Sequence, residues 1–254
     1  PDYWLANEEP WGHIDYNRDQ KVSFGGEVVE ENGKKVWKPA WSVRAVPVDY
    51  MVPGYASGRV NTLRLWTAKS YDEFDLLAFN RSEYMEAVVP QVKAENISKI
   101  LYPEDSTPQG KALRLEQQYF FVAASLHDAI RVFYPGQDKP DLTTFPDKIN
   151  FQLNDTHPVI GIPELMRVLM DEYGYDWDTA WKITNKTFNY TCHTLLPEAL
   201  EVWPSKLIGE LLPRHLEIIE KINDQFEAEL KAKGVDEATI KDMAIYTGDS
   251  VRMA

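Results

Sequence analysis

The chain has 254 residues, of which 44% are hydrophobic and 26% charged, enough for one large domain or two modest ones with a sizeable core. Its formal net charge of -13 argues against nucleic acid and against an anionic membrane surface as partners. No stretch approaches the roughly 18 apolar residues that span a bilayer, and the acidic first residues do not resemble a signal peptide. Cys192 is the only cysteine, so an internal disulfide is excluded and we expect a reducing, cytoplasmic compartment.

Residues 1–75 are typical of a β-rich segment. Runs at 21–30 and 34–48 predict strands, and Asn32-Gly33 between them predicts a hairpin turn. Pro39 and Pro47 predict that the second run is an edge strand or two shorter pieces. A further strand is expected at 60–67.

Residues 76–254 are mostly helical in pattern, with one strand near 148–153. Prolines, caps and apolar spacing predict helices at 83–101 (kinked or interrupted by Pro90), 111–133, 162–170, from Asp176 or Asp178 to about 190, at 214–233, and a short one after Asp236. Strands followed by helices around a further strand predict an α/β or α+β fold.

A polar turn, Asn154-Asp155-Thr156-His157, follows the strand near 148–153 and precedes a helix. Such a turn lies at the carboxyl end of its strand, where open α/β sheets bind ligands. The carboxylate of Asp155 and the imidazole of His157 suit a polyhydroxylated ligand. The alternative is a turn in which Asn154 and Asp155 bond their own backbone.

Two other groups of residues allow a chemical and a structural interpretation. Cys192 beside His193 could be a thiol nucleophile, but no activating surroundings are evident, and a buried structural cysteine is favoured. Glu198 or Glu201 could pair with Asp155 for glycoside hydrolysis, although solvated acids at a helix start are favoured. The histidine spacing gives no zinc signature, and no Gly-rich phosphate loop is present.

Eight segments together resemble the α-glucan phosphorylases, the family that acts on glycogen, starch and maltodextrin. They are VPGY (52–55), NTLRLW (61–66), AENIS (94–98), LYP (101–103), NDTHP (154–158), IPELMR (162–167), HTLLPEALE (193–201) and LPRHL (212–216). The similarity covers nearly the whole chain, in order.

The resemblance implies transfer of a glucosyl unit from the non-reducing end of an α-1,4-glucan to phosphate, giving glucose 1-phosphate with retention at the anomeric carbon. It implies a two-domain glycosyltransferase-B-type fold, of which this α/β chain is a Rossmann-like half, the later part of the N-terminal domain. Pyridoxal phosphate would be bound by a lysine of the C-terminal domain, outside this chain. The C-terminal half of the same protein and a second copy, as a homodimer, are the implied partners. We therefore expect the chain alone to be inactive, and both of its ends to be cuts inside a longer protein.

The resemblance also assigns roles to residues of this sequence. His193 is expected to hold the glucosyl ring as the catalytic residue, with Asp155 and His157 beside the anomeric carbon. The other implied substrate-site residues are Asn154, Thr194, Glu201 and Trp203 in or behind the pocket, Asp105 and Ser106 on a mobile gating loop, and Arg114 just after that loop.

Four positions depart from the family pattern. Ser106 replaces an asparagine that contacts the sugar in many relatives. Arg131 matches the first of two AMP-binding arginines, but Val132 replaces the second, so no AMP activation is expected. Glu220 replaces a tyrosine of a surface glycogen site, and Pro90 lies within a helix that resembles the one packing across the dimer.

Two other functions are consistent with the residues. A glycoside hydrolase using Asp155 and Glu201 would release sugar without phosphate. A non-catalytic glucan-binding or dimerisation module would bind saccharide or self-associate without turnover.

Overall fold

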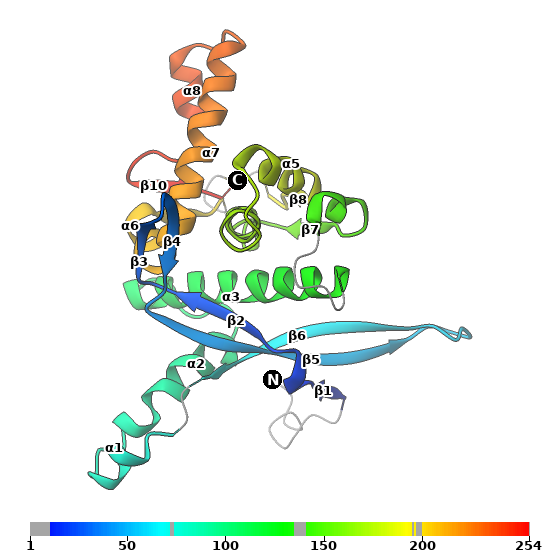
Figure 1. Cartoon of the computed structure of the whole chain (residues 1–254), viewed down its shortest axis with the longest axis vertical. Coiled ribbons are helices and arrows are strands. Elements are labelled where there is room, and N and C mark those ends of the chain that lie inside the picture. Colours follow the sequence, from blue (N-terminus) through cyan, green and yellow to red (C-terminus); the bar gives the residue numbers. More distant parts are fainter. Residues whose placement is uncertain (1–10, 72–73, 135–140, 195, 197–199, 254) are drawn as a thin grey trace. The chain divides into compact units, whose positions relative to one another are not determined.

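The computed structural model describes residues 11–71, 74–134, 141–194, 196 and 200–253 (Figure 1). The chain falls into two compact units, which are described separately. Unit 1 comprises Pro1–Val22 and Ser42–Phe120, and unit 2 comprises Ser23–Trp41 and Phe121–Ala254. Three elements contribute residues to both units: β2 (Gln20–Phe24), α3 (Pro108–Phe133), and β5 (Trp41–Pro53), of which only Trp41 belongs to unit 2.

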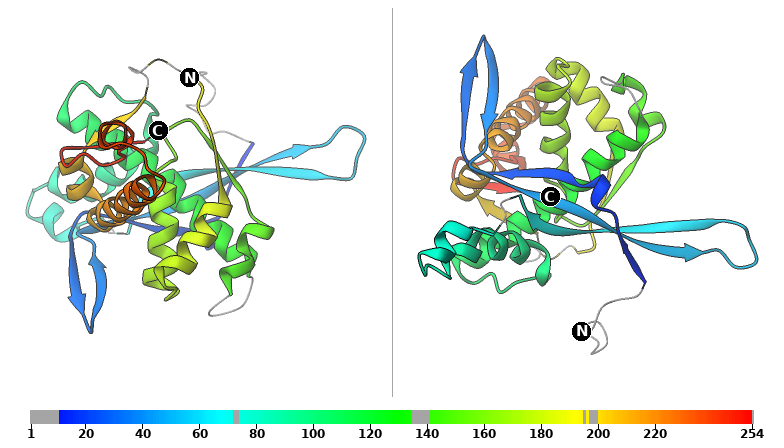
Figure 2. Two further views of the ribbon diagram at one scale, coloured as in Figure 1. Left: turned by 90° about the horizontal axis from the view of Figure 1, so that it is seen from above. Right: turned by 60° about the horizontal axis from the view of Figure 1, so that its bottom comes forward.

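Unit 1 is built on an antiparallel ladder between two long strands, β5 (Trp41–Pro53) and β6 (Val60–Ser70). The pairing runs from Val43 opposite Ser70 to Pro53 opposite Val60. β5 also pairs with β1 (Gly12–Ile14) and with β2, so the sheet has the order β1-β5-β2 with β6 attached to β5. The inner part of the ladder is buried, whereas the tip of the hairpin projects in both views of Figure 2.

The helices among the described residues of unit 1 are the short 3-10 helices η2 (Tyr16–Arg18) and η3 (Glu86–Val88), the α-helices α1 (Leu76–Asn80) and α2 (Val89–Lys99), and the first part of α3. The helical region expected over 83–101 is interrupted near Pro90, one of the two expected outcomes: η3 precedes α2, which begins at Val89, and Pro90 occupies the first turn of α2. Proline suits that position because the N–H groups of the first turn have no acceptor within the helix, so the N–H that proline lacks costs no hydrogen bond. α2 packs on β6, where the Ala68 N–H donates to Ser98 Oγ at 2.8 Å.

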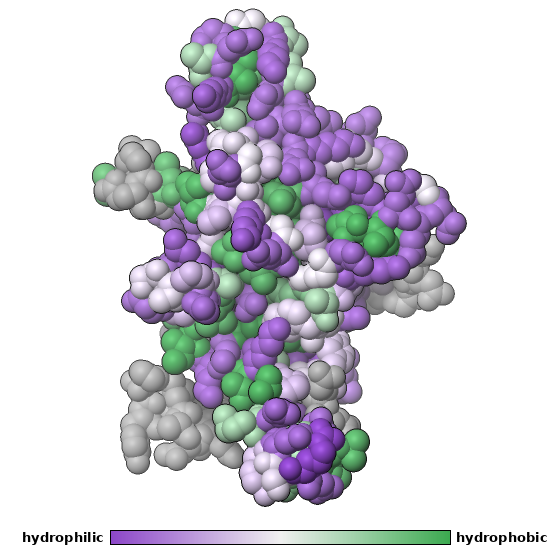
Figure 3. Space-filling model, turned by 90° about the vertical axis from the view of Figure 1, so that its left-hand side faces the viewer, coloured by the Kyte–Doolittle hydropathy of each residue, from purple (hydrophilic) through white to green (hydrophobic). Residues whose placement is uncertain are grey.

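Around α1, unit 1 exposes large apolar side chains. Leu76 and Leu77 are 61% and 71% exposed. In the space-filling view of Figure 3, hydrophobic residues lie among hydrophilic ones at the lower end, where Figure 1 places α1.

Unit 2 begins with a hairpin of β3 (Glu27–Glu31) and β4 (Lys34–Lys38), joined at Asn32-Gly33 as expected. The continuous strand expected over 21–30 is wrong, because Gly25 and Gly26 have φ values of 64° and 81° and turn the chain between β2 and β3. The run at 34–48 likewise divides, since β4 ends at Lys38, next to Pro39, and β5 begins at Trp41.

The centre of unit 2 is a strand–helix–strand segment. β7 (Phe151–Asn154) is followed by α4 (Gly161–Arg167), the π-helical turn η5 (Val168–Glu172), α5 (Trp177–Thr187) and β8 (Phe188–Thr191). β7 and β8 form a parallel pair. The helix expected to run to about 190 is therefore wrong beyond Thr187, where aromatic and β-branched side chains suit a strand. β7 also begins later than expected, because residues 148–150 form a turn and irregular backbone after the 3-10 helix η4 (Leu142–Asp147).

The last part of unit 2 contains β9 (Val202–Pro204), α6 (Ser205–Leu211), α7 (Pro213–Ala232), α8 (Glu237–Met243) and β10 (Ser250–Arg252). α7 and α8 match expectation: Gly234 follows α7 with φ 77°, and the Asp236 side chain accepts from the Thr239 N–H at 3.0 Å. The short antiparallel pair of β9 and β10, and α6, were not expected. The mixed α/β fold class, strand-rich early and helical later, is confirmed. No helix among the described residues is long and apolar enough to cross a membrane.

Candidate functional site

The parallel pairing of β7 and β8 brings two polar loops to one edge of unit 2. Asn154, the last residue of β7, lies opposite Thr191, the last residue of β8. The chain therefore leaves both strands at their carboxyl ends, side by side. The first loop carries Asp155 and His157, and the second carries His193 and Thr194. Residues 39 apart in sequence thus form one cluster, which we call the strand-end site.

His193 is the most exposed titratable member of this cluster, and its ring is anchored. Its Nε2 contacts the side-chain oxygen of Asn154. That oxygen only accepts hydrogen bonds, so His193 carries its proton on Nε2 and leaves Nδ1 as an acceptor in the neutral ring. Two further side-chain amide contacts cross the pair: Gln152 Nε2 donates to Thr191 Oγ1 at 2.8 Å, and Asn189 Nδ2 donates to Asn150 Oδ1 at 2.9 Å at the opposite end.

Asp155 has a left-handed backbone, with φ 73°. Its N–H donates to Thr191 O at 2.9 Å, and its Oδ1 accepts from the Thr156 N–H at 2.8 Å. The turn interpretation is therefore correct for Oδ1. The backbone strain of a non-glycine residue in this region is typical of a turn or a functional site.

His157 and Glu201 approach each other across the two loops. The distance from His157 Nδ1 to Glu201 Oε1 is 3.9 Å, and the Glu201 side chain is only 12% exposed. The Glu201 carbonyl accepts from the Met253 N–H at 3.0 Å, which ties this segment to the end of β10. Trp203, two residues further, is buried within β9, and its indole Nε1 has no hydrogen-bond partner among the described residues.

Cys192 is exposed, so the expectation of a buried structural cysteine is wrong. The residue lies beyond the last paired position of β8, and its thiol donates to the Thr194 carbonyl at 2.8 Å. Thr194 Oγ1 in turn accepts from the Leu196 N–H at 3.1 Å. Burial, and then the neighbouring Cys192 and Asp155, raise the pKa of Tyr190 to about 12. Tyr190 thus adds a protonated hydroxyl to the strand-end site, and the sequence pattern does not predict this. Its only sequence signal is its place in the aromatic and β-branched run that forms β8.

Glu198, the other carboxylate considered for hydrolysis, lies outside the described residues. Three further expected site residues, Asp105, Ser106 and Arg114, belong to unit 1, whereas the strand-end site belongs to unit 2.

These three residues form their own group at the start of α3. Arg114 Nη1 lies 3.2 Å from Asp105 Oδ2, and the guanidinium lies 5.9 Å from the centre of the Tyr102 ring. The Ser106 backbone N–H donates to Glu104 at 2.9 Å and lowers the pKa of that carboxyl. A side chain at Gly110 would meet Glu104 O at 1.8 Å, so the loop folds tightly over the first turn of the helix.

The side chains of the strand-end site and of the adjacent Glu201 do not suit the binding of pyridoxal phosphate or of a metal. It contains no lysine to form a Schiff base and no arginine to hold a phosphate. No group of three potential metal ligands occurs among the residues that were described. The chemistry that these side chains offer is hydrogen bonding to hydroxyl groups, together with the negative charge of two carboxylates.

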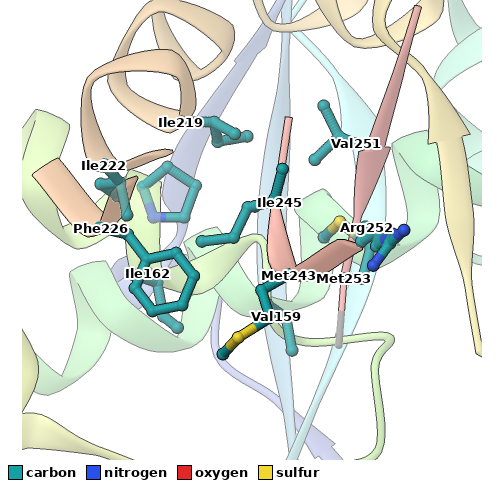
Figure 4. Close-up of a pocket in the computed structure, with 12 residues that line it drawn as sticks. Val159, Ile162, Ile219, Ile222, Phe226, Met243, Ile245, Val251, Arg252 and Met253 are labelled. Carbon is teal, nitrogen blue, oxygen red and sulfur yellow. The ribbon is translucent and has the colours of Figure 1, made fainter. Parts of the chain in front are cut away.

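A separate pocket of about 270 Å³ lies between α4, α7 and the chain around β10 (Figure 4). Carbon side chains such as Ile162, Ile219, Phe226 and Ile245 line it, and Arg252 is its only charged residue. Because a sugar needs many polar partners, this pocket does not offer a second saccharide site.

Comparison with known proteins gives consistent matches along the chain. The family model described as carbohydrate phosphorylase matches residues 1–254. A glycogen phosphorylase of Pasteurella multocida is 46% identical over 226 residues, covering 89% of this chain and 27% of the relative. The brain-form glycogen phosphorylase of Homo sapiens and the glycogen phosphorylase of Saccharomyces cerevisiae are each 50% identical over 230 residues, covering 88% of this chain. The chain spans about a quarter of the length of these relatives, 25% to 27%.

Proposed function

Because this chain belongs to the carbohydrate phosphorylase family, we propose that it is one part of an α-1,4-glucan phosphorylase, a glycosyltransferase. The enzyme would move a glucosyl unit from the non-reducing end of the glucan to phosphate and release glucose 1-phosphate. The observation that carries this proposal is the strand-end site, where an anchored imidazole and a strained aspartate meet at the carboxyl edge of a parallel pair.

In this proposal His193 holds the glucosyl ring. Its Nε2–H is engaged by Asn154, so Nδ1 accepts a hydrogen bond from a sugar hydroxyl. Asp155 uses one oxygen in its own turn and keeps the other for substrate. Its negative charge favours the positive charge that develops at the anomeric carbon when the glycosidic bond breaks.

The remaining site residues have supporting roles. His157, Thr194, Glu201 and Trp203 shape the inner pocket, and the short approach of His157 to Glu201 supports a shared hydrogen-bonded wall. Asp105 and Ser106 control access from their loop, and Arg114 lies just after it in α3. The contact between Arg114 and Asp105 supports one ordered form of that loop.

The rest of the machinery lies outside this chain. We propose that a C-terminal part binds pyridoxal phosphate, whose phosphate group supplies proton transfer to and from substrate phosphate. The complete protein is proposed to be a cytoplasmic homodimer without AMP activation, since Val132 replaces the second arginine. This chain alone is then inactive, because preorganised groups on both sides of the substrate are required.

The test is phosphorolysis of a maltooligosaccharide by the longer polypeptide that carries this chain, with glucose 1-phosphate as the measured product. We expect His193→Ala to lower kcat/KM by about 100-fold or more, as loss of a positioned transition-state contact does. His13→Ala is the matched control, because His13 is an exposed histidine of β1 in the other unit, and its kcat/KM is expected to stay unchanged.

Two outcomes would contradict the proposal. Release of glucose or maltose without phosphate would indicate a hydrolase. The hydrolase alternative pairs Glu201 with Asp155, whereas the contact of Glu201 in this structure is with His157. Saccharide binding without any turnover by the complete protein, with its cofactor supplied, would indicate a binding module.

A further inference from the structure

Unit 2 contains a buried ion cluster that the proposed chemistry does not use. At its centre is Glu164 of α4, which is fully buried. Arg167, one turn later, donates to it twice, at 2.8 Å and 2.9 Å. His215 Nε2 of α7 lies 2.6 Å from Glu164 Oε2, and His127 Nε2 of α3 lies 3.1 Å from Glu164 Oε1. One carboxylate therefore joins three helices.

The cluster is electrostatically consistent only with an ionised Glu164. Burial raises its pKa, but the Arg167 charge and the hydrogen bonds from His127 and His215 outweigh burial and hold the pKa well below the ordinary value. Burial lowers the pKa of His215, which is accordingly neutral with its proton on Nε2. Arg167, His127 and His215 are thus donors to the carboxylate, so a donor group at this position would face these three donors.

A second arginine and the hairpin close the cluster from the outside. Arg214 of α7 donates twice to Asp171 of η5, at 2.9 Å each. The Arg167 guanidinium lies 5.5 Å from the centre of the Trp37 ring of β4. Trp37 also packs edge-on against His215, with ring centres 5.4 Å apart. The continuous α4–η5 segment is therefore fixed against α7 at two places.

The amino end of the same helix is wedged against the elements of the strand-end site. A side chain at Gly161, the first residue of α4, would meet Val122 Cγ2 of α3 at 2.7 Å. The next contact would be the Phe188 ring, at the start of β8, at 3.5 Å. α4 therefore has no room to shift toward α3 or β8.

The segment that connects α4 to the strand-end site is short and hydrogen-bonded. Only five residues separate Asp155 from Gly161, and two of them, Thr156 and Ile160, are buried. The Val159 N–H donates to Thr156 O at 3.1 Å, and the Gly161 N–H donates to Pro158 O at 2.9 Å. A displacement of α4 is consequently transmitted to Asp155 and His157.

We propose that Glu164 is a positioning residue: by holding α4 between α3 and α7, it sets the placement of Asp155 and His157 relative to His193. The inference rests on the proposed function for the meaning of the site, but its geometric content can be tested without turnover. Glu164 does not touch the substrate and acts only through the turn at the start of α4.

The first test uses Glu164→Gln in this chain, because glutamine keeps the shape while replacing one acceptor oxygen by a donor group. The readout is the imidazole NMR signals, which are few, since the chain has five histidines. We expect the signals of His157 and His193 to shift while the circular dichroism of the chain is retained.

Asp49→Asn is the matched control. Asp49 is also largely buried, 7% exposed, and also accepts two bonds from one arginine, Arg64, at 2.7 Å each, but it belongs to unit 1. It should leave the His157 and His193 signals in place. Unchanged signals in Glu164→Gln, or equal shifts in both variants, would overturn the proposal.

If Glu164→Gln does not fold, His127→Leu replaces it. His127 is 21% exposed at the side chain and contributes one contact to the carboxylate, whereas Arg167 donates to it twice, so the fold loses less. Smaller shifts of the same two signals are expected, and their absence would equally overturn the inference.

The longer polypeptide separates this inference from the proposed function. In an active enzyme, Glu164→Gln should lower kcat about tenfold or more, and Asp49→Asn should leave kcat unchanged. If the longer polypeptide is inactive, the result counts against the proposed function alone. The NMR measurements on Glu164→Gln and Asp49→Asn still test the positioning role. An active parent in which Glu164→Gln keeps full kcat would count against the positioning role alone.

Discussion

Glu116 of α3 is a partly buried carboxyl whose raised pKa makes the stability of unit 1 depend on pH. Burial raises its pKa to about 7, and the charge of Lys93 offsets this only in part. Between about pH 4.5 and 7 the folded chain therefore binds this proton more tightly than the unfolded chain does. Its unfolding free energy falls as the pH rises through that window.

We predict that Glu116→Gln removes this loss. Because one pKa unit corresponds to about 1.4 kcal/mol, the variant should gain up to about 3 kcal/mol of unfolding free energy at pH 8 and nothing near pH 4. Urea unfolding across pH 4–8 measures the difference. Glu95→Gln, whose carboxylate pairs with Lys69 at 3.0 Å near the surface, is the control and should show no such gain. A Glu116→Gln variant that is less stable at pH 8 would contradict the assignment.

At the same scale, part of the site could be predicted from residue types alone. A polar turn after a strand predicts that Asp155 and His157 lie at the carboxyl end of that strand, which is where the structure has them. The contact between Asn154 and His193 could not be derived in this way. It depends on β8, whose first three residues fall in the helix that the pattern predicts up to about residue 190. The exposure of Cys192 depends on the same strand.

At the scale of elements, the two glycines at the ends of the β3–β4 hairpin carry different constraints. Gly26 has φ 81°, and a side chain there would lie 1.9 Å from Lys38 O. Gly33 has φ 73°, but nothing lies within 4 Å of the position that its side chain would take. Backbone strain is shared by both, whereas the clash is specific to Gly26.

We predict that Gly33→Ala costs about 1 kcal/mol of unfolding free energy, which is the usual cost of a left-handed backbone with a side chain. Gly26→Ala should cost at least about 2 kcal/mol more, because the hairpin must shift on α7, where Lys35 pairs with Glu217 at 2.9 Å. Thermal unfolding followed by circular dichroism measures both losses. Equal losses would show that the chain around Lys38 O adapts freely.

Element types were predictable where local signals were strong and long. α3 and α7 have a sustained apolar stripe, and the caps at Asp236 and Gly234 fixed the region of the last two helices. The short pair of β9 and β10 had no such signal, since strands of three residues are held by their partner rather than by their own sequence. Gly25-Gly26 is a sequence signal for the break between β2 and β3, since both residues have positive φ. The apolar alternation around the two glycines instead predicts one continuous strand.

At the scale of the molecule, each compact unit has its own buried core. Val43, Val46 and Ile97 are among the buried side chains of unit 1. Leu153, Leu165 and Ile208 are among those of unit 2. The sequence pattern divided the chain near residue 75 by composition, whereas contacts place the early β3–β4 hairpin in unit 2 and the helices α1 and α2 in unit 1. Composition reports local propensity and carries no information on which distant segments pack together.

This organisation predicts that the two units open separately. Asp49→Asn removes the paired charge that Arg64 faces in unit 1, and so should raise amide exchange in β5 and β6 by the factor that its stability loss dictates. Amides of α4, α5 and α7 should keep their protection. Hydrogen exchange followed by peptide mass analysis measures both sets in one sample, and α3, which contributes to both units, should respond only before Phe121. Uniform acceleration along the chain would mean that the protein opens as one cooperative body, because a local defect spreads only where cores are shared.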